Sequence, residues 1–220
     1  MSTPEWKREI NRALGDSIKK DPDAVTYVLS TSNHAAKQSK VRFVQHRGFV
    51  NEKSGGEDPS KNPAEDEEQG LVGEALVMCT DCRSEKVKHI LANETVELAW
   101  WFPVTGDQFR VTGKAFLSPR LGHPLQAVFQ EQHAKRLSPP GVKAGIDWEA
   151  ERWRIFGKLI PPIRAGFARP APGTPLKAIE RIGEQADDKE DYDPSTWAPL
   201  VTLDSDKALI DKAYYDFALL

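Results

Sequence analysis

The N-terminal part of the chain has the spacing of an amphipathic helix. Apolar side chains recur three or four positions apart, at Trp6, Ile10, Ala13, Leu14 and Ile18. This period predicts a helix over residues 6–19 with one apolar face. A threonine and a proline stand just before it, which is typical of a helix start, because proline is tolerated in the first turn.

A strand pattern follows. Residues 25–32 (VTYVLSTS) and 39–50 (SKVRFVQHRGFV) are rich in β-branched and aromatic side chains, which favours two strands. Regular alternation along the second run places Arg42 and Arg47 on opposite faces of the sheet. The two arginines therefore diverge unless the strand bends or contains a bulge. Three more runs, residues 73–80, 96–102 and 107–117, predict further strands.

Residues 84–93 (SEKVKHILAN) predict a helix between the third and fourth strands. Ser84 suits the N-cap position, and Val87, Ile90 and Leu91 form one apolar face. A short polar turn therefore leads directly from a strand into a helix start. At such a junction the free backbone N–H groups and the helix dipole favour a bound anion.

Lys86 supports an anion site at this turn. Its charge lies in the first turn of the predicted helix, where it opposes the helix dipole. A bound anion shared with the hydroxyl groups of Thr80 and Ser84 explains a cation at this position. The alternative is a capped surface helix that binds nothing.

The C-terminal half predicts helices more than strands. Residues 125–137 and 147–160 have helical patterns, and Asp147 can cap the second of them. Residues 161–176 (PPIRAGFARPAPGTPL) contain too many prolines for a regular helix to be expected. Residues 197–204 and 207–220 fit either a strand or a helix.

Charge is distributed unevenly over the 220 residues. Residues 51–74 carry a net charge of −6 and residues 183–206 a net charge of −7, whereas the whole chain carries −3, so the remainder carries +10. We interpret residues 51–70 and 183–196 as flexible acidic loops of a single domain spanning residues 1–220. The basic remainder favours anionic ligands, and charge alone leaves open whether these are phosphate compounds or nucleic acid.

Composition limits the classes of protein to which the chain can belong. Apolar residues make up 39% and charged residues 29% of the chain, and no apolar run reaches the length that spans a bilayer, so a cytoplasmic protein is expected. Cys79 and Cys82 form one CxxC pair. Because no second pair accompanies it, we expect no metal site.

Three segments together resemble the FMN-binding split barrel of the pyridoxamine 5′-phosphate oxidase-like proteins. They are residues 41–49 (VRFVQHRGF), 80–86 (TDCRSEK) and 108–113 (QFRVTG), in the order that the family has them, and the closest resemblance is to the subgroup with TDxRSxK and QFRxxG motifs. The resemblance implies a mainly β fold with flanking helices, a six-stranded antiparallel split β-barrel that pairs as a homodimer around FMN.

The resemblance also implies a set of cofactor-binding residues. They are Arg42, Phe43, Val44, Arg47, Cys79, Thr80, Ser84, Lys86 and Gln108. Arg42 is expected near the FMN phosphate, Arg47 nearer the ring or the substrate, and Gln108 at the polar edge of the flavin. Glu85 departs from the family pattern, which has a basic residue there, and Arg83 is a candidate to compensate for it.

The implied activity is flavin-dependent oxidation or reduction of a small molecule, and no side chain identifies itself as a catalyst of proton transfer. Two alternatives stay open. One is a flavin-binding carrier or sensor without turnover. The other is a basic β protein that binds nucleic acid or another anionic partner, which the resemblance makes the weaker hypothesis. The sequence does not identify the substrate.

Overall fold

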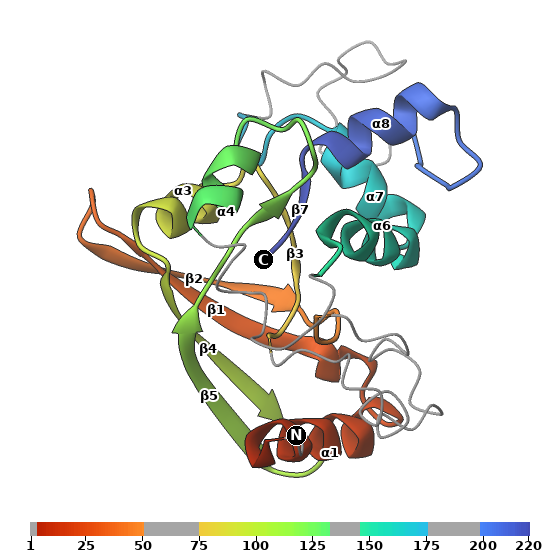
Figure 1. Cartoon of the computed structure of the whole chain (residues 1–220). Coiled ribbons are helices and arrows are strands. Elements are labelled where there is room, and N and C mark those ends of the chain that lie inside the picture. Colours follow the sequence, from red (N-terminus) through yellow and green to blue (C-terminus); the bar gives the residue numbers. More distant parts are fainter. Residues whose placement is uncertain (1–3, 51–74, 133–145, 176–198) are drawn as a thin grey trace.

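The computed structural model describes residues 4–50, 75–132, 146–175 and 199–220. These residues form seven strands in two antiparallel sheets that do not close into one barrel, with helices beside them (Figure 1). The expected mainly β fold with flanking helices is therefore confirmed at that level. The finer expectation was six strands in one split barrel, whereas the described strands number seven.

The larger sheet has four strands in the order β2-β1-β4-β5. Its strands are β1 (Thr26–Asn33), β2 (Gln38–Gln45), β4 (Thr95–Phe102) and β5 (Asp107–Lys114). Two hairpins supply them, and both tight turns contain a residue with positive φ, Lys37 and Gly106. The sheet is thus two local hairpins joined where β1 pairs with β4.

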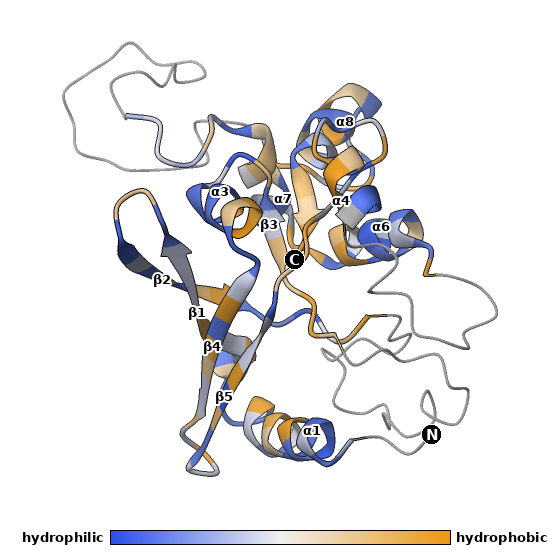
Figure 2. Cartoon of the chain, turned by 60° about the vertical axis from the view of Figure 1, so that its left-hand side comes forward, coloured by the Kyte–Doolittle hydropathy of each residue, from blue (hydrophilic) through white to orange (hydrophobic). Residues whose placement is uncertain are grey.

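Among the described residues, one face of the four-stranded sheet is covered by helices and the other is not. The side chains of Tyr27, Leu29, Leu98, Trp100 and Phe102 are buried on the covered face, in one hydrophobic core. Helices α1 (Glu5–Ile18) and α3 (Glu85–Ala92) pack on this core, and both lie on the same side of the sheet (Figure 2). The opposite face carries exposed apolar side chains, which we call the outer face.

The smaller sheet has three short strands in the order β3-β7-β6. They are β3 (Cys79–Asp81), β6 (Ser118–Pro119) and β7 (Phe217–Leu219). β7 lies between two cores, because Ala218 packs into the first and Phe217 and Leu219 pack into the second. Of the predicted strand over residues 73–80, the described part begins at Ala75. In that part only Cys79 and Thr80 belong to a strand, β3, while Leu76 makes an isolated bridge with Phe49.

The second core is helical. It is built from α6 (Trp148–Lys158), α7 (Pro161–Ala168) and α8 (Lys207–Tyr215), which gather beside β7 in Figure 1. The carboxylate of Asp147 caps α6 by accepting from the backbone N–H of Ala150 at 2.9 Å, as predicted. A 3-10 helix, Pro22–Val25, precedes β1, and α4 (Gln126–Gln132) follows β6.

The expectation that residues 161–176 form no regular helix is wrong for the first half of that segment. Pro161 and Pro162 occupy the first turn of α7, where no intrahelical N–H bond is lost. The helix ends just before Pro170. The predicted acidic loops, 51–70 and 183–196, lie outside the described residues. No described helix is both long enough and apolar enough to cross a membrane.

Candidate functional site

The turn between β3 and α3 is the centre of the candidate site. Asp81 shapes it: one carboxylate oxygen accepts from the backbone N–H of Arg83 at 2.7 Å. This local bond reverses the chain directly after β3, so that α3 begins four residues beyond Asp81. The predicted helix and its start at Ser84 are confirmed.

A lysine and two hydroxyl groups meet at this turn. Lys86 Nζ donates to Thr80 Oγ1 at 3.0 Å and to Ser84 Oγ at 3.1 Å, and the two hydroxyl oxygens lie 3.3 Å apart. Ser84 holds the N-cap position of α3, yet its hydroxyl does not cap the helix. Its hydroxyl is thus directed to the lysine, and the three groups can converge on one anion.

Arg42 adds a second positive charge beside Lys86. Its Nη1 donates to the carbonyl oxygens of Leu29 at 3.1 Å and Lys40 at 3.0 Å. Burial lowers the pKa of Lys86, and the charge of Arg42 lowers it further. Neither cation forms an ion pair with a carboxylate in the part of the chain that the structure describes. Two like charges held together in this way favour an anionic ligand between them.

Arg47 reaches the same region because β2 ends before it. The strand stops at Gln45, and the backbone N–H of Arg47 donates to Val77 next to the smaller sheet, at 2.7 Å. The Arg47 side chain comes close enough to the thiol of Cys79 to act on its pKa. Burial raises the pKa of this thiol, while Arg47 and Lys86 oppose the rise. The predicted divergence of Arg42 and Arg47 is avoided because the strand alternation ends.

The structure therefore gathers six of the nine predicted residues around one turn: Arg42, Arg47, Cys79, Thr80, Ser84 and Lys86. Val44 shares the face of Arg42 but packs against the core. Phe43 lies on the outer face with 77% of its surface exposed. Gln108 is exposed on β5, opposite Trp101.

Gln108 is far from Arg42 within one chain. Arg42 pairs with Leu29, Leu29 with Leu98, and Leu98 with Val111, which stands three residues from Gln108. Three strand spacings and three residue rises place the two backbone positions roughly 17 Å apart. Side chains alternate between the two faces along a strand, and Gln108 stands three residues from Val111, which shares the face of Arg42. Gln108 is therefore directed to the outer face, opposite to Arg42.

Arg83 does not compensate for Glu85. Its guanidinium is bound by the carboxylates of Asp81 and Asp216 and by two carbonyl groups after α3 in sequence. Glu85 itself is exposed, and its carboxylate lies 3.7 Å from His89. No sequence pattern indicates Asp216 as a partner of Arg83, because that residue stands far away along the chain.

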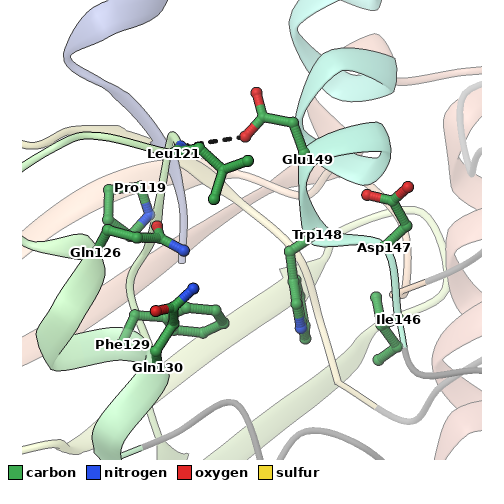
Figure 3. A pocket seen from close by; sticks show the side chains of 9 residues that line it. All are labelled: Pro119, Leu121, Gln126, Phe129, Gln130, Ile146, Asp147, Trp148 and Glu149. Carbon is green, nitrogen blue, oxygen red and sulfur yellow. Dashed lines mark hydrogen bonds between the residues drawn. The ribbon is translucent and has the colours of Figure 1, made fainter.

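A separate hollow lies between α4 and α6 (Figure 3). It has a volume of about 240 Å³, and the rings of Phe129 and Trp148 meet at its wall with centroids 5.5 Å apart. Glu149 lines its rim and accepts from the backbone N–H of Leu121 at 3.2 Å. None of the predicted cofactor-binding residues lines it. Among the described residues, no group of three or more His, Cys, Asp or Glu side chains is placed to hold a metal ion.

Comparison with solved structures supports the fold. A pyridoxamine 5′-phosphate oxidase-related, FMN binding protein from Nostoc punctiforme PCC 73102 is similar with a TM-score of 0.59 at 22% identity, over 100% of this chain and 80% of that one. A protein of unknown function from Agrobacterium tumefaciens str. C58 has a TM-score of only 0.32 at 10% identity, over 53% of this chain and 42% of that one. No curated protein matches the chain.

The family comparison covers the region that contains all nine predicted residues. Residues 3–119 match the model described as pyridoxamine 5′-phosphate oxidase, FMN-binding domain. The match spans more than half of the chain and includes α1, the four-stranded sheet and the turn with Lys86. The chain therefore belongs to the family of pyridoxamine 5′-phosphate oxidase FMN-binding domains, whose cofactor is FMN.

Proposed function

We propose that this chain is an FMN-dependent oxidoreductase of the split-barrel type that acts on a small molecule, and that the turn between β3 and α3 holds the FMN phosphate. The observation that carries the proposal is the Lys86 group: an ammonium, two hydroxyls and a nearby guanidinium, with no carboxylate paired to either cation among the described residues.

The donor chemistry of this turn fits a phosphate monoester. Lys86 supplies charge, Thr80 and Ser84 supply hydroxyl donors, and the start of α3 supplies backbone N–H groups. In the absence of an anion the two hydroxyls act as acceptors for Lys86. When a phosphate takes over as acceptor, both hydroxyl protons and the ammonium protons can turn toward it.

FMN supplies the hydride chemistry in an enzyme of this kind, and the protein binds and orients it. Arg42 and Lys86 hold the charged end, while Arg47 and Cys79 form the adjoining wall. Arg47 Nη2 donates to Gln45 Oε1 at 2.7 Å, which holds the Arg47 side chain in this wall.

We also propose that the chain acts as a homodimer. Phe43, Val28 and Ala99 are direct cross-strand neighbours on the outer face, and Val41 and Trp101 extend this apolar surface with 68% and 54% exposure. Exposed apolar surfaces of this kind mark association sites. A second copy laid on this face would bring its own Gln108 into the interface, because Gln108 also lies on the outer face.

A flavin-binding carrier or sensor is the second candidate. Two buried histidines stand near the site residues in sequence, His46 beside Arg47 and His89 in α3. Burial lowers the pKa of His46 to about 3, and His89 Nδ1 is bound to Thr31 Oγ1 at 3.0 Å. An enzyme of this kind would leave proton transfer to the substrate, the cofactor or water.

Two measurements test the proposal. Calorimetric titration with FMN and with riboflavin, which lacks the phosphate, should give much tighter binding of FMN. Equal affinities for FMN and riboflavin would refute the proposed phosphate site. Anaerobic addition of small amines, or of a nicotinamide reductant, to the FMN-loaded protein should bleach the flavin absorbance. Admission of oxygen as the electron acceptor should then restore the absorbance and allow product to form in amounts exceeding the protein. Bleaching without multiple turnovers would favour the carrier or sensor.

A further inference from the structure

Arg83 makes more contacts than any other side chain of the turn. Its Nε donates to one Asp81 oxygen at 2.9 Å and its Nη2 to the other at 2.6 Å. Its Nη1 donates to the carbonyl of Arg169 at 2.9 Å and its Nη2 to that of Phe167 at 3.0 Å. The carboxylate of Asp216 lies 3.3 Å from Nε. Arg83 is thus bound by β3, by the end of α7 and by the residue between α8 and β7.

These partners connect the turn to the C-terminal helices. Phe167 and Arg169 lie at the carboxyl end of α7, where unpaired carbonyl groups and the helix dipole favour a cation. The backbone N–H of Cys82 donates to the Asp216 carbonyl at 2.7 Å, which adds a second link. Both links join the turn to elements outside the residues that match the family model.

The negative charge of the Asp81 carboxylate is unfavourable for an anion site at this turn. It follows Thr80 directly, is buried, and is close enough to Lys86 to act on its charge. A free carboxylate here would compete with a phosphate for Lys86 and would repel the phosphate. Arg83 binds both oxygens of this carboxylate, so that its negative charge is compensated and its position is fixed.

We propose that Arg83 is a positioning residue of the FMN phosphate site. Arg83 binds the Asp81 carboxylate and is itself bound by α7 and Asp216, so that the carboxylate is kept away from Lys86. Lys86 therefore remains available to the phosphate. The inference rests on the proposed function, because it concerns the same turn. Arg83 itself does not contact the ligand in this account. FMN affinity consequently depends on a C-terminal segment that lies outside the family match.

Charge rescue tests this role. Arg83→Gln removes the compensating charge and keeps a side chain that can donate to a carbonyl group. Asp81→Asn removes the carboxylate charge while its amide oxygen can still accept from the Arg83 backbone N–H that shapes the turn. Arg12→Gln is the matched control, since Arg12 of α1 also bridges to a separate element, by an ion pair with Asp107 of β5, but far from the turn.

Calorimetric titration of each variant with FMN and with riboflavin gives the readout. Arg83→Gln should weaken FMN binding about tenfold or more, which is the effect known for residues that orient a metal ligand by hydrogen bonding to it. Riboflavin binding should be unchanged. The double variant Asp81→Asn/Arg83→Gln should regain most of the lost FMN affinity, and Arg12→Gln should bind as the parent chain does. Thermal melts establish which variants are folded.

Three outcomes would overturn the inference: unchanged FMN affinity in Arg83→Gln, equal weakening for FMN and riboflavin, or no recovery in the double variant. If Arg83→Gln does not fold, Asp81→Asn alone decides, because it should tighten FMN binding and a loss of affinity would contradict the role given to Arg83. A parent chain that does not prefer FMN to riboflavin would instead refute the phosphate site itself.

Discussion

Replacing Lys86 with alanine removes the central donor of the proposed phosphate site at little cost to the fold. In the ligand-free chain, burial and the neighbouring Arg42 already disfavour the charged lysine, and its position opposes the dipole of α3. The hydroxyls of Thr80 and Ser84 lie 3.3 Å apart and can bond to each other once the ammonium is gone. The free energy of unfolding should therefore change by less than about 1 kcal/mol.

Binding should respond much more strongly. A hydrogen bond from an ammonium to a charged phosphate contributes about 1.5–3 kcal/mol, which corresponds to a loss of about ten- to a hundredfold in FMN affinity. Because Lys86 is partly buried, added salt should reduce this loss only in part. Riboflavin affinity should be unchanged.

Calorimetric titration of FMN into the parent chain and into Lys86→Ala measures the effect. Lys88→Ala is the control, since Lys88 is exposed two residues further along the same helix and directed to another side of it. Equal FMN affinities in Lys86→Ala and Lys88→Ala would refute the reasoning, because the start of α3 would then not hold the phosphate.

Three further outcomes are expected. Burial and Arg42 lower the pKa of Lys86, so the lysine loses its proton at a lower pH than an ordinary lysine does. FMN affinity of the parent chain, measured in a series of titrations at rising pH, should therefore fall over that pH range. Lys86→Ala should show no such fall. Phe43→Glu should convert the proposed dimer to a monomer in light scattering and weaken FMN binding, whereas Ile160→Glu, which changes an exposed apolar residue on the helical part, should do neither. Replacing residues 51–70 by a short Gly/Ser linker should leave FMN affinity intact, because an acidic segment repels a phosphate; a collapse of affinity in a folded variant would assign that segment to the site.

The local part of the site could be predicted from the sequence because it depends on neighbours in the chain. Thr80, Ser84 and Lys86 lie within one turn and the helix after it, so strand and helix patterns suffice to bring them together. The prolines of α7 misled because a count of prolines ignores their positions. Both stand in the first helical turn, where proline is compatible with the helix.

The remaining part depends on tertiary structure. The alternation rule separated Arg42 from Arg47, but the strand ends between them, and the backbone N–H of Arg47 pairs with Val77 beside the smaller sheet. The carbonyl partners of Arg83, on Phe167 and Arg169, stand more than 80 residues away in the sequence, so no local pattern indicates them. Gln108 is separated from Arg42 by the strand order β2-β1-β4-β5, which no local sequence pattern indicates.

The visible absorption spectrum of the purified chain, recorded before and after addition of FMN and removal of excess ligand, tests the central claim most directly. A flavin band should stay with the protein, and chromatography of the flavin released by denaturation should identify FMN. A protein that remains colourless after incubation with FMN, or that retains only FAD, would contradict the assignment of FMN as its cofactor.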